Sequence, residues 1–292
     1  MVVNNLDKNK YNSVLIVIEK DGKWKFGDKK SVDLGNALQI LKAYDFAFIA
    51  MHGTFGEDGR IQALLEWANI PYSGSGVLGS AMAMDKEISN ERYKAVGLNV
   101  PRYVILKDFK SGIKVPVVVK PVDGGSSVGV SIVKAKVDFK RAMKKAFGES
   151  SRIMVQEFIR GRELTCGVLE DKFGKPFALP PTEIIPKTSA FFDYKAKYTV
   201  GGSMEITPVR LSSALTKKLQ RMALEAHRAL GCGGMSRSDF ILKGTKFYIL
   251  ETNTIPGMTK TSLLPQAAKA AGINFSSMLD LIIKAGLRRS RA

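Results

Sequence analysis

The stretch ILETNTIPGM, residues 249–258, places a carboxylate and an amide two positions apart, just where an apolar run gives way to Pro-Gly. Side chains alternate along a β-strand, so Glu251 and Asn253 are predicted to lie on one face of the strand. Leu250 and Thr252 are predicted to lie on the opposite face. Two oxygen ligands would therefore converge where this strand ends.

A neighbouring strand is predicted just upstream. SRSDFILK (236–243) is followed by a Gly turn, so Asp239 is expected beside the 249–258 strand. Three oxygen donors could then share one site, and hard divalent cations such as magnesium prefer carboxylate and amide oxygens. A hairpin with solvated acids on one face is the alternative, and these residues alone leave it open.

The composition is that of an ordinary globular protein. The chain of 292 residues is 45% hydrophobic and 25% charged, which is long enough for two or three modest cores. No apolar run approaches the ~20 residues of a membrane span, and the N-terminus lacks the order of a secretory signal. We therefore expect a cytoplasmic protein with no membrane partner.

Cysteine and histidine are too scarce for a disulfide framework or a zinc site of the Cys or His type. Cys166 and Cys232 are predicted to be two buried thiols. His52 and His227 cannot form a histidine cluster. His227 lies in TKKLQRMALEAHRALG, a helical pattern, and is predicted to lie on the helix surface.

The net charge of +18 fits three partners: nucleic acid, an anionic membrane surface, or phosphorylated small molecules bound inside a lysine-rich surface. The basic residues are dispersed, without a long basic run or a motif typical of nucleic-acid binding. Specific nucleic-acid binding is therefore not expected. The cations that end LIIKAGLRRSRA suit a helix C-terminus and need no partner.

Strands and helices are predicted to alternate in an α/β (α+β) fold. A Gly/Ser-rich joint, PYSGSG, suggests a change of domain near residue 76. The predicted domains are 1–75, 76–160 and 161–292. The predicted strands are 13–19, 46–52, 115–121, 130–135 and 152–159, and the predicted hairpin follows later in the chain. The predicted helices are 34–43, 60–68, a long segment after 76, 137–147, 213–230, 262–271 and 275–286, and 180–208 is expected to be irregular.

The stretch VVVKPVDGGSSVGVSIV (117–133) places a lysine at a strand end, followed by glycines and serines before the next strand. Glycines let backbone N–H groups approach phosphate oxygens, and Lys120 could add a positive charge. The common P-loop motif is absent, and the loop joins strand to strand. It therefore predicts a lid over phosphates, although a plain hairpin turn is the alternative.

Five segments together resemble the D-alanine–D-alanine ligase family of the ATP-grasp superfamily. They are HGTFGEDGRIQALLEWANIPYSGSGVLGSAMAMDK (52–86), KPVDGGSSVGVS, VQEFIRGRELTCGVLE, FFDYKAKYTVGG and ETNTIPGMTKTSLLPQAAKAAG, in the family's order and at suitable spacing. The resemblance covers nearly everything from about residue 46 to 286. It implies an ATP-grasp fold and favours the metal-site interpretation of Glu251 and Asn253.

The resemblance also assigns roles to individual residues. It implies ATP contacts for Lys86, Lys120, Glu157, Phe158, Ile159, Glu163 and Lys197, with Glu157 and the backbone of Phe158 and Ile159 at the adenine and Glu163 at the ribose. It implies that Asp239, Glu251 and Asn253 hold two Mg²⁺ ions, or Mn²⁺. It implies catalytic roles for Arg237, Gly257, Ser126 and Tyr198, and substrate contacts for His52, Ser262 and Leu263.

The implied reaction is the ATP-driven ligation of two D-alanine molecules, through a D-alanyl phosphate, for peptidoglycan precursors. Arg237 and the backbone N–H of Gly257 would stabilise the oxyanion. Ser262 and Leu263 begin a predicted helix whose free N–H groups favour a carboxylate. The aromatic Tyr198 beside Lys197 favours D-alanine over D-lactate as second substrate, and the family suggests a homodimer.

Three alternatives stay open: another ATP-grasp carboxylate–amine ligase, a weakly active or non-catalytic ATP-binding relative, and a basic nucleic-acid binder. The start KYNSVLIVIEKDGKWKF resembles the family's second strand, so the family's first β-α unit, with its Glu for the first amino group, is expected to be missing. Poor ligation of D-alanine by the 292 residues alone is the corresponding expectation.

Overall fold

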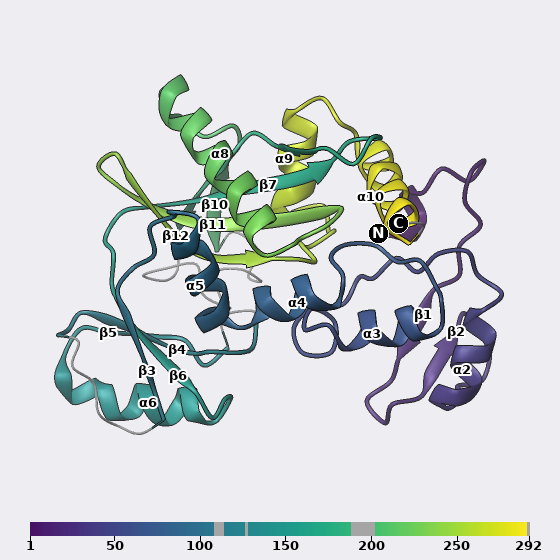
Figure 1. Ribbon diagram of the computed structural model, residues 1–292, viewed down its shortest axis with the longest axis horizontal. Helices are drawn as coiled ribbons and strands as arrows, with labels where there is room; N and C mark the ends of the chain where they lie inside the picture. Colours follow the sequence, from purple (N-terminus) through teal and green to yellow (C-terminus); the bar gives the residue numbers. More distant parts are fainter. Residues whose placement is uncertain (108–113, 126–127, 188–201, 291–292) are drawn as a thin grey trace.

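A computed structural model describes residues 1–107, 114–125, 128–187 and 202–290, and Figure 1 shows three separate β-sheets joined by helices. Three residues with predicted roles, Ser126, Lys197 and Tyr198, lie outside the described residues.

The N-terminal part is built around a two-stranded antiparallel sheet. Its elements are α1 (Val2–Asn5), β1 (Ile16–Ile18), β2 (Trp24–Phe26), α2 (Leu34–Leu41) and α3 (Arg60–Trp67). The strand predicted over 46–52 is wrong. Among the described residues, Ala47 makes a single bridge to Tyr72, because no neighbouring strand continues the ladder there.

The middle part begins with two consecutive helices, α4 (Val77–Met84) and α5 (Lys86–Ala95). Asp85 separates them because its backbone is extended, and its carboxylate then caps α5 by accepting from the N–H groups of Glu87 and Ile88. In Figure 1 these helices run across the centre of the molecule, between the sheets.

A four-stranded antiparallel sheet follows, in the order β3-β6-β4-β5. Its strands are β3 (Tyr103–Leu106), β4 (Val117–Pro121), β5 (Ser131–Val133) and β6 (Ile153–Glu157), with the short 3-10 helix η1 (Lys136–Asp138) and α6 (Phe139–Phe147) before β6. Alternate residues of β4 and β6 pack against α6: Val117, Val119, Ile153 and Val155 are fully buried there. The intervening residues face the other way, toward the third sheet.

The third sheet has the order β10-β9-β7-β11-β12, with β8 paired to β7. Its strands are β7 (Arg162–Glu170), β8 (Pro176–Ala178), β9 (Thr182–Pro186), β10 (Ser203–Ile206), β11 (Met235–Lys243) and β12 (Lys246–Asn253). β9 and β10 lie within 180–208, so the prediction that this stretch is wholly irregular is wrong. Burial explains the difference for β9, since Thr182, Glu183 and Ile184 are buried beside β7.

Three helices cover the third sheet: α8 (Ser213–Ala229), α9 (Leu263–Ala270) and α10 (Phe275–Arg289). α8 packs on the face that carries Phe240, Phe247 and Ile249. His227 of α8 was predicted at the helix surface, and this is wrong. It is 2% exposed, and its Nδ1 lies 2.8 Å from Ser236 Oγ.

The first and last parts of the chain share one hydrophobic core. Trp24, Leu38 and Leu41 belong to the same buried cluster as Met278 and Ile282 of α10. The helix α9, which carries the predicted second-substrate residues, contributes Leu264, Ala267 and Ala268 to this shared core. The domain boundaries 1–75, 76–160 and 161–292 remain a prediction.

Both cysteines are free thiols. Cys166 is fully buried and Cys232 is partly buried, so the prediction of two buried thiols is confirmed for Cys166 only. Within the described ranges, no single helix is long and apolar enough to cross a membrane, and only α9 and α10, bent by 107°, pass that test as a pair. Both of these helices bury residues in the cores described above.

Candidate functional site

A cavity lies between the four-stranded and six-stranded sheets. One wall carries Val118, Lys120 and Ile132, and the opposite wall carries Ile241 and Leu250. The sheets therefore supply a largely apolar slot with charged residues at one end, a common design for small-molecule sites. The residues with predicted roles that also line this cavity are Lys86, Glu157, Phe158, Ile159, Glu163, Asp239 and Glu251.

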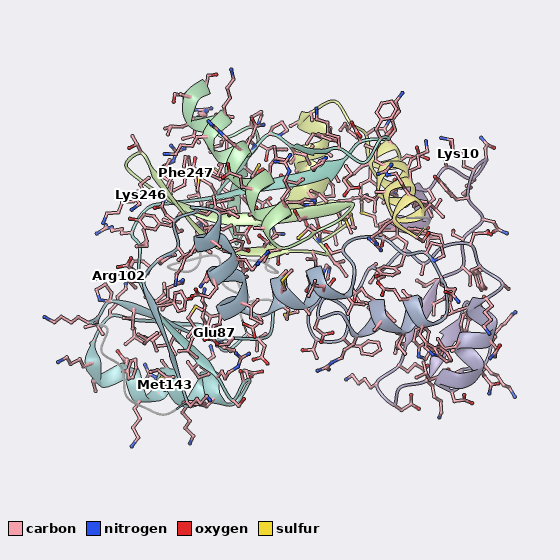
Figure 2. All side chains as sticks on the ribbon, in the orientation of Figure 1. Lys10, Glu87, Arg102, Met143, Lys246 and Phe247 are labelled. Carbon is pink, nitrogen blue, oxygen red and sulfur yellow. The ribbon has the colours of Figure 1, made fainter. Side chains whose placement is uncertain are left out.

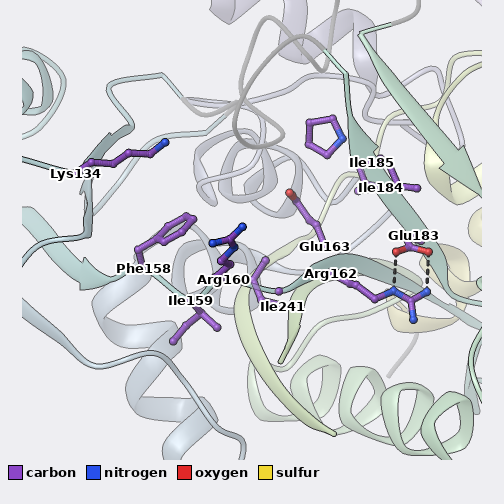
Figure 3. A pocket seen from close by; sticks show the side chains of 12 residues that line it. Lys134, Phe158, Ile159, Arg160, Arg162, Glu163, Glu183, Ile184, Ile185 and Ile241 are labelled. Atoms are coloured by element: carbon purple, nitrogen blue, oxygen red, sulfur yellow. Dashed lines mark hydrogen bonds and ion pairs between the residues drawn. The ribbon is translucent and has the colours of Figure 1, made fainter. Parts of the chain in front are cut away.

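A second cavity, of about 620 Å³, lies beside the slot, and Figure 3 shows it from close by. Phe158, Ile159 and Glu163 line both spaces. Arg162 is anchored beside them by two 2.7 Å contacts to the carboxylate of Glu183, drawn as dashed lines in Figure 3. The predicted ribose residue, Glu163, therefore lies where the two spaces meet.

Lys86 and Lys120 supply positive charge from two different elements. Lys86 starts α5, and its Nζ donates to the carbonyl oxygen of Gly124, 2.7 Å away, in the glycine-rich turn. Lys120 ends β4 and is only 6% exposed. Burial, with a smaller contribution from the nearby Lys86 charge, lowers the pKa of Lys120 to about 8, although Glu251 opposes this shift.

The start of α5 is braced from the four-stranded sheet. Arg152, just before β6, contacts the carboxylate of Asp85, and its Nη1 lies 2.9 Å from Glu87 Oε2. The two acidic residues flank Lys86 in sequence. This bridge fixes the helix start that carries the lysine to the sheet that carries the glycine-rich turn.

The predicted adenine residues do not all face the cavity with their side chains. Glu157 accepts from the backbone N–H and from Nε of Arg102, at 3.1 and 2.9 Å. Arg102 is labelled at the edge of the four-stranded sheet in Figure 2. Sequence reasoning missed the preceding residue, Gln156, whose buried side chain lines the slot. Strand alternation was the signal that could have found it, because Gln156 and Glu157 must face opposite sides.

The predicted metal ligands come together on the β11–β12 hairpin. Asp239 and Glu251 are directly paired across the two strands, and Asn253 is paired with Arg237. Asn253 Nδ2 lies 3.3 Å from Asp239 Oδ2. Thr165 on β7 donates to Asp239 Oδ1 over 2.6 Å and holds this carboxylate from behind.

A β-bulge in the hairpin puts Leu250 on a different face of the strand from the one predicted. The register shifts beside Asp239, so Phe240 pairs with Ile249 and Leu250 is the extra residue. Glu251 lines the cavity, and Asn253 lies on the same face because its side chain reaches Asp239, whereas Thr252 is buried on the opposite face, as predicted. The predicted placing of Leu250 on the face opposite Glu251 is wrong, because the bulge lets both residues line the slot.

Arg237 lies between acidic groups. It makes two contacts with Asp239, Nε to Oδ1 at 3.1 Å and Nη2 to Oδ2 at 3.0 Å. Burial alone would lower its pKa, but the charge of Asp239 and its hydrogen bonds raise it, with further help from Glu251 and Glu57. Arg237 therefore keeps its positive charge although its side chain is only 13% exposed.

Glu57 is a second residue that sequence reasoning missed. It belongs to HGTFGEDG, in which only His52 had a predicted role. The backbone N–H of Gly53 donates to Glu57 Oε2 over 2.6 Å, and burial raises the pKa of the carboxyl group. Its charge interacts with those of His52 and Arg237, so this segment brings an N-terminal carboxylate to the site.

The predicted second-substrate residues lie at the start of α9. Ser262 precedes this helix and Leu263 is its first residue. Ser262 Oγ accepts from the backbone N–H of Thr259 over 2.9 Å. A Cβ on Gly257 would lie 2.7 Å from the same Oγ, so only glycine fits here without a shift. Gly257 and Ser262 are thus neighbours, as their predicted roles require.

Two antiparallel sheets that enclose a lysine-lined slot, with an acidic hairpin at one end, define an ATP-grasp fold. Comparison with known proteins supports this class. Residues 93–284 match the family model described as D-ala D-ala ligase C-terminus, and residues 27–75 match the model described as D-ala D-ala ligase N-terminus. This chain belongs to the D-alanine–D-alanine ligase family.

Individual relatives agree with this assignment. The chain is 44% identical to the D-alanine–D-alanine ligase of Syntrophobacter fumaroxidans, over 98% of this chain and 90% of that protein. It is 45% identical to the D-alanine–D-alanine ligase of Leptospira interrogans, over 91% of this chain and 79% of that protein.

Solved structures of other ligases share the fold. The D-alanine–D-alanine ligase from Bacillus anthracis complexed with ATP matches with a TM-score of 0.81 and 33% identity, covering 99% of this chain and 91% of that one. The D-Ala:D-Ser ligase from Enterococcus faecalis matches with a TM-score of 0.84 and 31% identity, over 97% and 92%.

Proposed function

We propose that this chain joins two D-alanine molecules into D-alanyl-D-alanine at the expense of ATP. The observation that carries the proposal is the convergence of Lys86, Lys120, Glu163, Asp239 and Glu251 on one slot between two sheets. The relatives named above are ligases of this kind, and one of their structures holds ATP.

ATP fits the slot in one orientation. The apolar walls suit the base, Glu163 at the junction of the two cavities suits the ribose hydroxyls, and the lysines suit the phosphates. Lys120 and Lys86 are close enough for each charge to affect the other. Phosphate oxygens between them would relieve that repulsion.

The hairpin residues fit Mg²⁺ or Mn²⁺, which favour hard oxygen ligands. Within the described part of the chain there is no group of three or more His, Cys, Asp or Glu residues arranged for a metal. The fit therefore depends on the amide oxygen of Asn253 as a third donor, beside Asp239 and Glu251. When bound, such ions neutralise phosphate charge. Thr165 and Arg237 both hold the carboxylate of Asp239 in place.

The reaction has two balanced steps. A carboxylate oxygen of the first D-alanine attacks the γ-phosphorus of ATP, and ADP leaves, giving an acyl phosphate. The neutral amine of the second D-alanine then attacks the acyl carbon, inorganic phosphate leaves with the bonding pair, and the nitrogen gives up one proton to become the amide N–H. Positioning and charge neutralisation supply most of the acceleration.

Six residues are proposed to act on the reacting groups or to close over them. Arg237 and the N–H of Gly257 stabilise the oxyanion of the second step, because the guanidinium stays charged in a largely buried position. Ser262 and the start of α9 hold the second carboxylate. The proposal also includes three residues that lie outside the described residues. Lys197 would contact the transferred phosphoryl group, and Ser126 and Tyr198 would help to close the site.

The proposal includes the cellular use of the product and the assembly of the protein. D-alanyl-D-alanine would serve peptidoglycan precursor synthesis in the cytoplasm, and a homodimer is the proposed assembly. Equilibrium sedimentation of the purified chain tests the assembly separately from the activity.

The test of function is substrate-dependent ADP release, with the product identified by mass spectrometry. D-Alanine should give ADP and the dipeptide, whereas L-alanine should give neither. D-Serine and D-lactate are the important competitors, since a D-Ala:D-Ser ligase shares the fold. If D-Ala-D-Ser formed in preference to D-Ala-D-Ala, the second substrate would be D-serine and not D-alanine. ATP binding without turnover on any of these substrates would contradict ligase activity.

A further inference from the structure

Three buried hydroxyl groups lie directly behind the proposed metal ligands. Tyr93, on α5, is fully buried, and its hydroxyl donates to Thr252 Oγ1 over 2.8 Å. Thr252 Oγ1 in turn lies 2.8 Å from the hydroxyl of Ser238, which is also fully buried. This hydroxyl chain, made of Tyr93, Thr252 and Ser238, therefore joins α5 to both strands of the β11–β12 hairpin.

The hydroxyl chain meets the hairpin between the residues with proposed roles in the reaction. Ser238 and Thr252 pair with each other across the two strands. The neighbouring pairs on either side are Arg237 with Asn253, and Asp239 with Glu251. The register shift lies beyond these pairs, so side chains alternate regularly here and the hydroxyls lie on the face opposite the proposed metal ligands. Any movement of Ser238 and Thr252 therefore moves the ligands on both sides of them.

The other end of the hydroxyl chain lies on the helix that carries Lys86. Tyr93 and Lys86 are seven residues apart on α5, so they lie on nearly the same side of the helix, about 10 Å apart along its axis. Lys86 lines the slot, and Arg152 ties the start of α5 to the four-stranded sheet. Figure 1 shows α5 between that sheet and β12. The helix is therefore a rigid link between the proposed phosphate lysine and the proposed metal ligands.

The reaction needs such a link because Lys86 and the metal ions must contact one triphosphate at the same time. Groups that act on a transferred phosphoryl group have to be held within about 0.5 Å of their productive positions. A hydrogen bond fixes a distance and a direction, whereas apolar packing alone fixes neither. A buried network of satisfied hydroxyls is thus suited to hold the hairpin in one position relative to α5.

We propose that Tyr93 is a positioning residue of this ligase: through the hydroxyl chain, it holds the metal-binding hairpin at a set distance from Lys86. Tyr93 is not among the described residues that line the slot, so it acts through the hairpin and not by contact with a ligand. This inference rests on the proposed function, because it assumes that Asp239 and Glu251 bind metal. It gives the hydroxyl chain a role in metal affinity in addition to a role in stability.

The test measures Mn²⁺ binding in the presence of a non-hydrolysable ATP analogue, from the paramagnetic resonance signal of free Mn²⁺. Tyr93→Phe removes one hydroxyl and keeps the ring, and Thr252→Val removes its partner and keeps the shape. Each variant should raise the Mn²⁺ dissociation constant roughly threefold to tenfold, the usual worth of one hydrogen bond. The double variant should bind Mn²⁺ as Thr252→Val does, because the bond between the two residues is already lost.

Two further variants are controls. Thr252→Ser keeps the hydroxyl and loses a methyl group, so it should bind Mn²⁺ as the wild type does. Tyr11→Phe removes a tyrosine hydroxyl that donates to Asp280 of α10 over 2.6 Å, outside the slot and the hairpin. It should lower the free energy of unfolding in urea, as Tyr93→Phe does, but leave the Mn²⁺ affinity unchanged. Tyr93→Phe decides the test alone if urea unfolding shows that Thr252→Val has lost its fold.

The outcomes separate this inference from the proposed function. Wild-type Mn²⁺ affinity in both Tyr93→Phe and Thr252→Val would overturn the positioning role and leave the proposed metal site in place. Losses that add up in the double variant would also overturn it, because the two residues would then act separately. No Mn²⁺ binding by the wild-type chain with the nucleotide analogue would overturn the metal site itself, and this inference with it.

Discussion

The guanidinium of Arg237 donates two hydrogen bonds, of 3.1 and 3.0 Å, to the carboxylate of Asp239 on the same face of β11. One of these residues is proposed to bind metal and the other to stabilise the oxyanion. Asp239 would therefore have two tasks: it is proposed to offer an oxygen to the metal, and it orients the arginine. Glu251 is paired with Asp239 across the hairpin and, in the described part of the chain, makes no hydrogen bond to Arg237. A change at Glu251 therefore tests the metal role while the carboxylate that orients Arg237 stays in place.

Glu251→Gln is expected to lower D-alanine ligation by about two orders of magnitude or more, because a neutral amide replaces a charged metal ligand of the same shape. Asp239→Asn should be at least as damaging, and it should also lower the free energy of unfolding, because Arg237 loses a partner for its buried charge. Steady-state turnover and urea unfolding measure the two effects. Wild-type turnover by Glu251→Gln at ordinary magnesium would contradict the metal assignment.

ATP affinity should fall as the pH rises above about 8. The pKa of Lys120 is lowered from 10.5 to about 8, so its positive charge is present below pH 8 and is lost above it. Bound phosphate favours the charged form, so ATP binding near pH 8 to 9 should be accompanied by proton uptake. Calorimetry in two buffers with different ionisation enthalpies measures this uptake. In Lys120→Arg the positive charge is permanent, so the proton uptake on ATP binding should disappear. Equal proton uptake by the two proteins would show that a group other than Lys120 binds the proton.

The buried His227 should make the fold sensitive to mild acid. Burial lowers its pKa from 6.5 to about 4, so the unfolded chain binds a proton that the folded chain does not. Its contribution to stability is complete above pH 6.5 and is lost as the pH falls toward 4, by about 3 kcal/mol in total. Urea unfolding at pH 7, 6 and 5 measures the loss. His227→Gln cannot titrate, so its stability should depend less on pH, and parallel curves for the two proteins would refute this account.

Gly257→Ala should weaken the second-substrate site in particular. The new Cβ would lie 2.7 Å from Ser262 Oγ, which is already held by the Thr259 N–H, so the start of α9 must move. We expect the D-alanine concentration needed for half-maximal dipeptide formation to rise roughly tenfold, as misplaced binding groups typically cost. ATP affinity should stay unchanged because the slot lies between the sheets. An equal loss of ATP affinity would indicate a general structural defect.

Much of the fold could be predicted from local patterns. The helices predicted over 34–43, 213–230 and 275–286 lie within a few residues of α2, α8 and α10, since their apolar spacing and end signals are local. The strand predicted over 46–52 was wrong because strand formation depends on a neighbour, which a local apolar run cannot reveal. His227 could have been placed correctly, because it lies four residues after the buried Ala223 and eight after the buried Leu219.

The residues of the site could be predicted where side chains alternate regularly along a strand, and could not be predicted where a bulge interrupts that alternation. Glu251 and Asn253 share one face of β12 as predicted. The bulge at Leu250 adds a residue on one strand only, which the pattern of a single strand does not encode. Glu57 was missed for a different reason. Its place beside Arg237 depends on a contact between the N-terminal part and β11, far apart in sequence.

The core shared by Trp24, Leu38 and Met278 has a consequence for how the chain is made. During synthesis the first part leaves the ribosome long before α10 exists, so its apolar side chains must wait for the last helix to cover them. The central sheet and α6 can close their own core much earlier, because their contacts are local. The wall of the slot on the central sheet can therefore take shape early in synthesis. The opposite wall, which carries Ile241 and Leu250, follows later, and the helix α9 becomes fixed only when α10 packs onto the N-terminal part.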